Sequence, residues 1–388
     1  MSHQSRVDLA ELRFGDDRLP GGGQAAELRT CEVPGLGRQL FKRYLPQTRD
    51  DLDAGALADL VAWRHELPGT ERELLDRRCA WPRAVVTDAD GVCGVLMAPA
   101  PQAFMQTVRR KNQVMTLPRA LDNLARTRTS AGRLDMPYYE PPVKLAVLGR
   151  LVETAQWLHG HGWAVGDLQP RNALFTLDGG ARVHLIDCDS CARLHGKSPF
   201  PPGDPEGWKL PEAGRFDEHS DYYKIAWSVV RCVQDNLEST RIDRAALLGC
   251  VTTPTLELLT DACQALPLPD ARERWASLAT GWPRLVTDRG MYVTVDGSLR
   301  KRWTPPAAQT PAPQPTRAPQ PDSVPPPIPV PPPLAEPPSE PARPPTTDWI
   351  DRLLTVFGMG AVMVLLGLAF YGVILLVDWS LDRLSELI

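Results

Sequence analysis

A proline-rich segment followed by an apolar one limits how much of this 388-residue chain can fold as a globular domain. Between residues 305 and 345, 19 of 41 residues are proline, and such a composition buries too little apolar surface to fold. We expect residues 304–347 to form a disordered linker, extended as polyproline II. The globular part of the chain is therefore expected within residues 1–303.

The segment 353–377 contains 25 residues and no charged side chain. A helix of this length reaches about 37 Å, which exceeds the hydrocarbon thickness of a bilayer, about 30 Å. The pattern predicts one transmembrane helix within residues 348–388, followed by a short tail. Basic residues are more numerous before the span than after it. We therefore expect a single-pass protein of the cell inner membrane with residues 1–303 in the cytoplasm.

Charge and cysteine usage narrow the class of the domain. The formal net charge of −4 gives no signal for nucleic acid binding. Eight scattered cysteines without an N-terminal apolar signal segment predict reduced thiols and no disulfide framework. Cys188 and Cys191 have the spacing of a zinc or redox pair, but no second pair accompanies them, so we expect neither chemistry there.

Three polar residues are spaced around a predicted β-hairpin. Asp167 lies five residues before Asn172 and twenty before Asp187, and two apolar runs between the latter two flank a turn at Gly179-Gly180. The hairpin would bring two carboxylates and an amide together. These groups suit phosphoryl transfer from Mg-ATP, with Asp167 orienting a hydroxyl and with Asn172 and Asp187 binding Mg²⁺. The alternative is ordinary turn and strand-end carboxylates, which the spacing of all three groups disfavours.

At these positions the chain resembles the protein-kinase-like family. The run from Gly166 to Asn172 is similar to the family's catalytic loop, and the run from Ile186 to Ser190 is similar to its metal-binding loop. The variant looks like a divergent bacterial subgroup, often encoded with phosphatase and von Willebrand A-type partners. The resemblance implies an α+β, two-lobed kinase fold with an N-lobe at about 1–98 and a C-lobe at about 99–303. It also implies ATP and Mg²⁺ as cofactors.

The resemblance assigns roles to residues nearer the N-terminus. Lys42, on a predicted third strand, matches the lysine that holds the α- and β-phosphates. Gly22 and Gly23 belong to a glycine loop whose backbone amides would approach the phosphates, although a flexible turn explains the same pattern. Met97 would begin the hinge between the lobes, where backbone groups bind adenine. The alternative for that segment is a simple hydrophobic hairpin.

A predicted helix over residues 50–66 would supply the acidic partner of Lys42. The segment has no glutamate before Glu66, which leaves Asp59 as the candidate partner. A solvent-exposed position for Asp59 is the alternative. In the metal-binding loop, we expect Asp189 to form a turn instead of facing a metal.

Two acidic residues beyond the site are expected to be structural. Glu212 ends a segment similar to a kinase activation segment, with Arg272 as its buried partner. Asp221 opens an apolar helix and, in the family, supports the backbone of the catalytic loop. The basic segment from Arg109 to Arg133 is expected to be a solvated helical surface, with a substrate- or partner-binding insertion as the alternative.

Together these features predict a membrane-anchored Ser/Thr protein kinase that transfers the γ-phosphoryl group of ATP to protein hydroxyls. Asp167 and Lys42 would be its catalytic residues. Two alternatives stay open. The incomplete glycine loop and the missing helix glutamate favour a pseudokinase, a nucleotide-binding scaffold at the membrane. A small-molecule kinase would use the same residues on a different acceptor.

Overall fold

In the computed structural model, the described residues are 5–20, 24–110, 113–201, 203–204, 207–211, 216–287, 291–293 and 299–300. All of them belong to one unit, Met1–Ala312. The predicted linker at 304–347 and the predicted membrane helix at 353–377 lie outside them. Within the described residues, no helix has the length and apolar character needed to span a bilayer.

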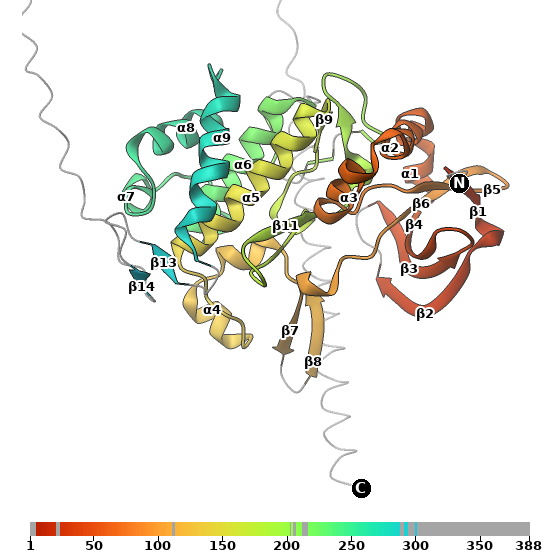
Figure 1. Ribbon diagram of the computed structural model, residues 1–388, viewed down its shortest axis with the longest axis horizontal. Coiled ribbons are helices and arrows are strands. Elements are labelled where there is room, and N and C mark those ends of the chain that lie inside the picture. Colours follow the sequence, from red (N-terminus) through yellow and green to blue (C-terminus); the bar gives the residue numbers. More distant parts are fainter. Residues whose placement is uncertain are drawn as a thin grey trace, which may run out of the picture. The chain divides into compact units, whose positions relative to one another are not determined.

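The fold is of the α+β class, and its N-terminal part is built on a curled six-stranded sheet (Figure 1). The strand order is β1-β5-β6-β4-β3-β2; β1 runs parallel to β5, and the other neighbours are antiparallel. Gly35 and Gly37, at φ of 79° and 69°, set the turn between β3 and β4, because L side chains rarely adopt such angles. The strands are β1 (Arg6–Asp8), β2 (Arg13–Pro20), β3 (Ala25–Val33), β4 (Gly37–Tyr44), β5 (Ala84–Asp88) and β6 (Gly91–Met97).

Three helices lie between β4 and β5 in the chain. They are α1 (Pro46–Asp50), α2 (Ala54–Glu66) and α3 (Gly69–Arg78). The single helix predicted over 50–66 is wrong at its start, because Asp53 caps a new helix by accepting a 3.0 Å hydrogen bond from the backbone nitrogen of Ala56. The apolar face of α2, which includes the buried Leu57 and Leu60, packs towards β5.

The rest of the described chain is mainly helical. One of these helices, α5, runs from Pro141 to Gly160. Proline at the first helical position costs no hydrogen bond, which is why the helix can begin there. This helix, α5, packs against α6 and α9. The helices are α4 (Arg128–Arg133), α5 (Pro141–Gly160), α6 (Glu218–Val233), α7 (Arg244–Leu248), α8 (Thr253–Cys263) and α9 (Ala271–Gly281).

Four short strand pairs complete the described part of the fold. They are β7 (Met105–Arg110) with β8 (Gln113–Pro118), β9 (Trp163–Ala164) with β12 (Ala192–Arg193), β10 (Ala173–Thr176) with β11 (Arg182–Leu185), and β13 (Tyr292–Val293) with β14 (Leu299–Arg300). The hairpin predicted around Gly179-Gly180 is confirmed as β10–β11.

The segment between Arg109 and Arg133 is not the helical surface that its charge pattern predicts. Its first part completes the β7–β8 hairpin, which extends away from the helices in Figure 1. β-branched residues of the segment, Val114 and Thr116, favour extended backbone and explain the difference. Within this segment, α4 is the one α-helix that the described residues contain.

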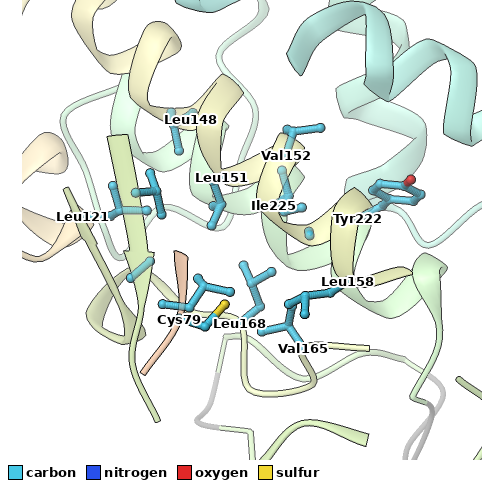
Figure 2. Packing of buried hydrophobic residues seen from close by; sticks show 14 of the residues in the cluster. Cys79, Leu121, Leu148, Leu151, Val152, Leu158, Val165, Leu168, Tyr222 and Ile225 are labelled. Carbon is cyan, nitrogen blue, oxygen red and sulfur yellow. The ribbon is translucent and has the colours of Figure 1, made fainter. Parts of the chain in front are cut away.

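The larger hydrophobic core lies where α5 and α6 meet (Figure 2). Leu151 of α5 and Ile225 of α6 are fully buried there. Val165 and Leu168, 5% and 2% exposed, belong to the same core and lie on either side of Asp167 in the chain. Burial of both neighbours fixes the backbone that carries this carboxylate.

Candidate active site

The β10–β11 hairpin brings Asn172 and Asp187 to its open end. Ala173 pairs with Leu185, and the backbone nitrogen of Ile186 donates a 2.8 Å hydrogen bond to the carbonyl of Asn172. The residue after this pair, Asp187, adopts a left-handed conformation with φ of 63°. For a residue other than glycine this conformation is strained, and such strain is concentrated at functional sites.

Lys42 of β4 connects the sheet to the loop that follows β11. Its ammonium nitrogen donates hydrogen bonds to Asp187 and, at 2.9 Å, to Oδ1 of Asp189. The hydroxyl of Tyr44 donates to the other oxygen of Asp189 at 2.9 Å. Lys42 and Asp189 are buried, whereas the Asp187 side chain is 36% exposed. We call Lys42, Tyr44, Asp187 and Asp189 the ion cluster.

The ion cluster corrects the prediction for Asp59. Asp59 is exposed on α2, and Lys42 pairs with Asp187 and Asp189 in its place. Asp189 lies in a short 3-10 turn, as predicted, but it is fully buried there and its carboxylate accepts a hydrogen bond from the ammonium of Lys42. The physical reason is that a buried lysine needs a counter-charge, and the loop after β11 passes closer to it than α2 does.

The charges of the ion cluster perturb one another. Burial raises the pKa of Asp189 to about 6, although Lys42 opposes the shift. Burial alone would lower the pKa of Lys42, but the charges and hydrogen bonds of the two aspartates outweigh it and raise that pKa. Lys42 therefore stays a cation at neutral pH.

Asp167 is held by two amide side chains. Nε2 of Gln169 donates to its Oδ1 and Nδ2 of Asn172 donates to its Oδ2, both at 2.8 Å. Burial raises the pKa of Asp167, the Gln169 hydrogen bond opposes the shift, and the nearby charge of Asp187 adds to it. A carboxylate whose pKa is raised is a better proton acceptor than an exposed one.

Asp221 supports the backbone that precedes Asp167. Fully buried on α6, it accepts hydrogen bonds from the backbone nitrogens of Val165 at 2.8 Å and Gly166 at 3.1 Å. The ring of His159 contacts the same carboxylate at 2.8 Å. Gly166 has φ of 76°, a conformation that glycine adopts without strain. These contacts give Asp221 a structural position behind the loop.

The remaining predicted residues lie apart from these contacts or outside the description. Gly22, Gly23 and Glu212 are not among the described residues, so the glycine loop and the proposed pairing with Arg272 lie outside them as well. Met97 is buried at the end of β6, where it pairs with Leu40 of β4. It therefore lies on the strand next to the one that carries Lys42.

Sequence reasoning missed Tyr44 and Gln169 and underestimated Asp189. Tyr44 lies two residues after Lys42, and side chains two apart point to the same face of a strand. That alternation is the signal that would have placed it beside the lysine. Gln169 carries no comparable signal, because its contact with Asp167 depends on the local loop conformation.

Magnesium is the metal that this arrangement would suit. Mg²⁺ prefers oxygen ligands, keeps several waters, and is held by one or two carboxylates together with substrate phosphates. Asn172 and Asp187 carry an amide and a carboxylate at the open end of the same hairpin, and Asp187 is partly accessible. Within the described part of the chain, no cluster of three or more His, Cys, Asp or Glu side chains is arranged as a metal site by itself.

Comparison with models of protein families gives no match, and comparison with curated proteins gives none either.

Proposed function

We propose that this chain is a protein-kinase-like phosphotransferase that moves the γ-phosphoryl group of ATP to a Ser or Thr hydroxyl of a protein. One observation carries the proposal: a buried lysine on a sheet strand meets the aspartate that follows the β10–β11 hairpin, and Asn172 and Asp167 adjoin that same hairpin. Phosphoryl transfer is catalysed mainly by positioning and by charge, so such a set of groups suffices in principle.

Each residue has a distinct role in this proposal. Asp167, kept in place by two amides, would accept or orient the proton of the attacking hydroxyl. Lys42 would hold the α- and β-phosphates. Asn172 and Asp187 would bind magnesium, which when present neutralises phosphate charge. Asp221 binds the loop backbone and the ring of His159, and is a positioning residue.

The proposal extends to the two halves of the domain, the nucleotide-binding segments and the C-terminal segment. We propose that the sheet and the helical part correspond to the two lobes of a kinase, and that Met97 begins the hinge that binds adenine. The glycines at 22 and 23 would cover the phosphates. Residues 353–377 would anchor the protein in the inner membrane with the domain in the cytoplasm, where phosphatase or von Willebrand A-type proteins would be its partners.

A membrane-bound scaffold without catalytic activity is the second candidate. The observation that favours it is the pairing of Lys42, whose ammonium is bonded to two aspartates of the metal-binding loop, while Asp59 of α2 is exposed. A lysine held in this way has to exchange a carboxylate for phosphate before it can assist transfer. Magnesium-dependent ATP binding without turnover would favour this candidate.

A phosphoryl-transfer assay tests the proposed function. The full-length chain, purified in mild detergent, is incubated with γ-labelled ATP, Mg²⁺ and a generic protein acceptor. We expect labelled phosphoserine or phosphothreonine, lost in Asp187→Asn. The matched control is Asp178→Asn, since Asp178 is an exposed carboxylate on the same hairpin. Equal labelling by both variants, or none by the wild type, would contradict the proposal.

A further inference from the structure

A second site of interest lies on a different part of the domain from the ion cluster. An open pocket of about 530 Å³ is bordered by α3, α5, the β10–β11 turn, the 3-10 turn Gln102–Phe104 and the 3-10 turn Trp282–Leu285. Its volume falls within the range of small-molecule sites, about 300–1,000 Å³. We call it the arginine pocket. Neither Lys42 nor Asp187 lines it.

The arginine pocket has a strong excess of positive charge. Among the described residues that line it are four arginines and one glutamate, a net of three positive charges. Three of the arginines come from elements far apart in the sequence, so the fold has to gather them. The charged residues are Arg77 and Arg78 of α3, Arg150 and Glu153 of α5, and Arg182 of β11.

Glu153 engages only two of these guanidinium groups. One oxygen accepts a hydrogen bond from Arg78, and the other accepts one from Arg150 at 2.6 Å. Arg77 is 65% exposed, and its closest carboxylate, Glu73, is 3.8 Å away, beyond hydrogen-bond distance. The pocket therefore holds guanidinium donors that no carboxylate among the described residues satisfies with a short contact.

The wall beside these donors is apolar. The guanidinium carbon of Arg182 lies 5.8 Å from the centre of the Phe104 ring, and its Nη2 donates only to a backbone carbonyl, at 2.9 Å. Phe104 and several aliphatic side chains line the same cavity. Guanidinium groups bind phosphate and carboxylate with paired hydrogen bonds, whereas an aromatic wall favours a ligand with an apolar body.

We propose that the arginine pocket binds a small organic phosphate, with the phosphate on Arg77 and Arg182 and the apolar part against Phe104. Glu153, the one carboxylate among the described lining residues, is already bonded to two arginines, which disfavours a cationic ligand. The site does not depend on the proposed kinase activity, because it shares no residue with the ion cluster. Failure of either proposal leaves the other intact.

Isothermal titration with phenyl phosphate tests the proposal. The full-length chain is titrated in EDTA, which removes magnesium and with it any metal-assisted binding near Asp187. We expect a dissociation constant of about 1 mM or lower. Inorganic phosphate should bind at least threefold more weakly, since it lacks the apolar part. Equal binding of the two anions, or no binding of phenyl phosphate, would overturn the proposal.

Three variants test where the anion binds. Arg77→Gln combined with Arg182→Gln should weaken phenyl phosphate binding at least tenfold. Arg133→Gln, at an exposed position on α4, is the matched control and should bind as the wild type does. Glu153→Gln should bind phenyl phosphate more tightly, because it frees the guanidinium groups of Arg78 and Arg150.

The double arginine variant should lose affinity for phenyl phosphate, whereas Glu153→Gln should gain it. Misfolding does not explain both results, because a misfolded variant would not gain affinity. The same affinity in the double arginine variant and the wild type, or weaker binding by Glu153→Gln, would refute the site.

Discussion

Replacing Lys42 by methionine isolates the energetics of the ion cluster. Methionine keeps much of the length of the lysine side chain but removes the charge that faces Asp189, which is fully buried. Leaving a buried carboxylate without its partner costs about 3–5 kcal/mol. We therefore expect Lys42→Met to lower the free energy of unfolding by that amount at pH 8. Lys197→Met, at an exposed lysine, should change it by less than about 0.5 kcal/mol.

The loss of stability caused by Lys42→Met should depend on pH, and the direction of this dependence follows from the titration of Asp189. The pKa of this carboxyl is raised from 3.8 in its ordinary state to about 6 in the folded protein. The folded state therefore binds this proton more tightly than the unfolded state does. The resulting contribution to the free energy of unfolding is complete below pH 3.8 and is lost as the pH rises through about 6. Without the lysine the pKa rises further, so at about pH 5 Asp189 is neutral and its unpaired charge disappears.

Urea unfolding followed by tryptophan fluorescence measures this effect at pH 8 and pH 5. We expect the destabilisation by Lys42→Met at pH 5 to be less than half of that at pH 8. Adding Asp189→Leu to Lys42→Met should restore at least about 2 kcal/mol at pH 8, because it removes the stranded charge. A loss below about 1 kcal/mol at pH 8, or a loss independent of pH, would refute the reasoning.

Three further predictions concern the loop around Asp167. Asp221→Ala should lower the free energy of unfolding by about 2–6 kcal/mol, because two backbone N–H groups lose a buried acceptor and each costs about 1–3 kcal/mol; a loss below about 1 kcal/mol in urea unfolding would contradict this. Gly179→Ala should cost about 1–2 kcal/mol for its positive φ alone. Gly166→Ala should cost more in the same measurement, since its Cβ would also meet a ring and a backbone oxygen at 3.1–3.2 Å; equal costs would argue against that crowding. Burial raises the pKa of Asp167 above its ordinary value of 3.8. As the pH is lowered, the rate of phosphoryl transfer should therefore begin to fall before pH 3.8 is reached. A rate that stays constant down to pH 3.8 would contradict a proton-accepting role for Asp167.

Local patterns predicted the parts of the fold that have local causes. Apolar runs on either side of Gly179-Gly180 predict a hairpin, and the structure confirms it as β10–β11. The position of Lys42 on a strand is confirmed as well. These features depend on residues a few positions apart. β-branched runs, turn glycines and helical periodicity predict such local structure directly.

The partners within the candidate site depend on contacts over long sequence separations. The resemblance to kinases pointed to Asp59 of a helix as the partner of Lys42, yet the loop after β11 brings Asp189 to the lysine from 147 positions away. Sequence order alone does not say which of two carboxylates approaches a lysine. The arginine pocket has the same origin, because α3, α5 and β11 each contribute only one or two of its charges.

A change of Asp167 to asparagine, assayed for both ATP binding and phosphoryl transfer on the same sample, tests the central claim most directly. The account predicts ATP affinity close to that of the wild type, because Lys42, Asn172 and Asp187 remain. Transfer should fall at least about 100-fold, the contribution expected of a positioned proton acceptor. Transfer at the wild-type rate by Asp167→Asn would contradict the account.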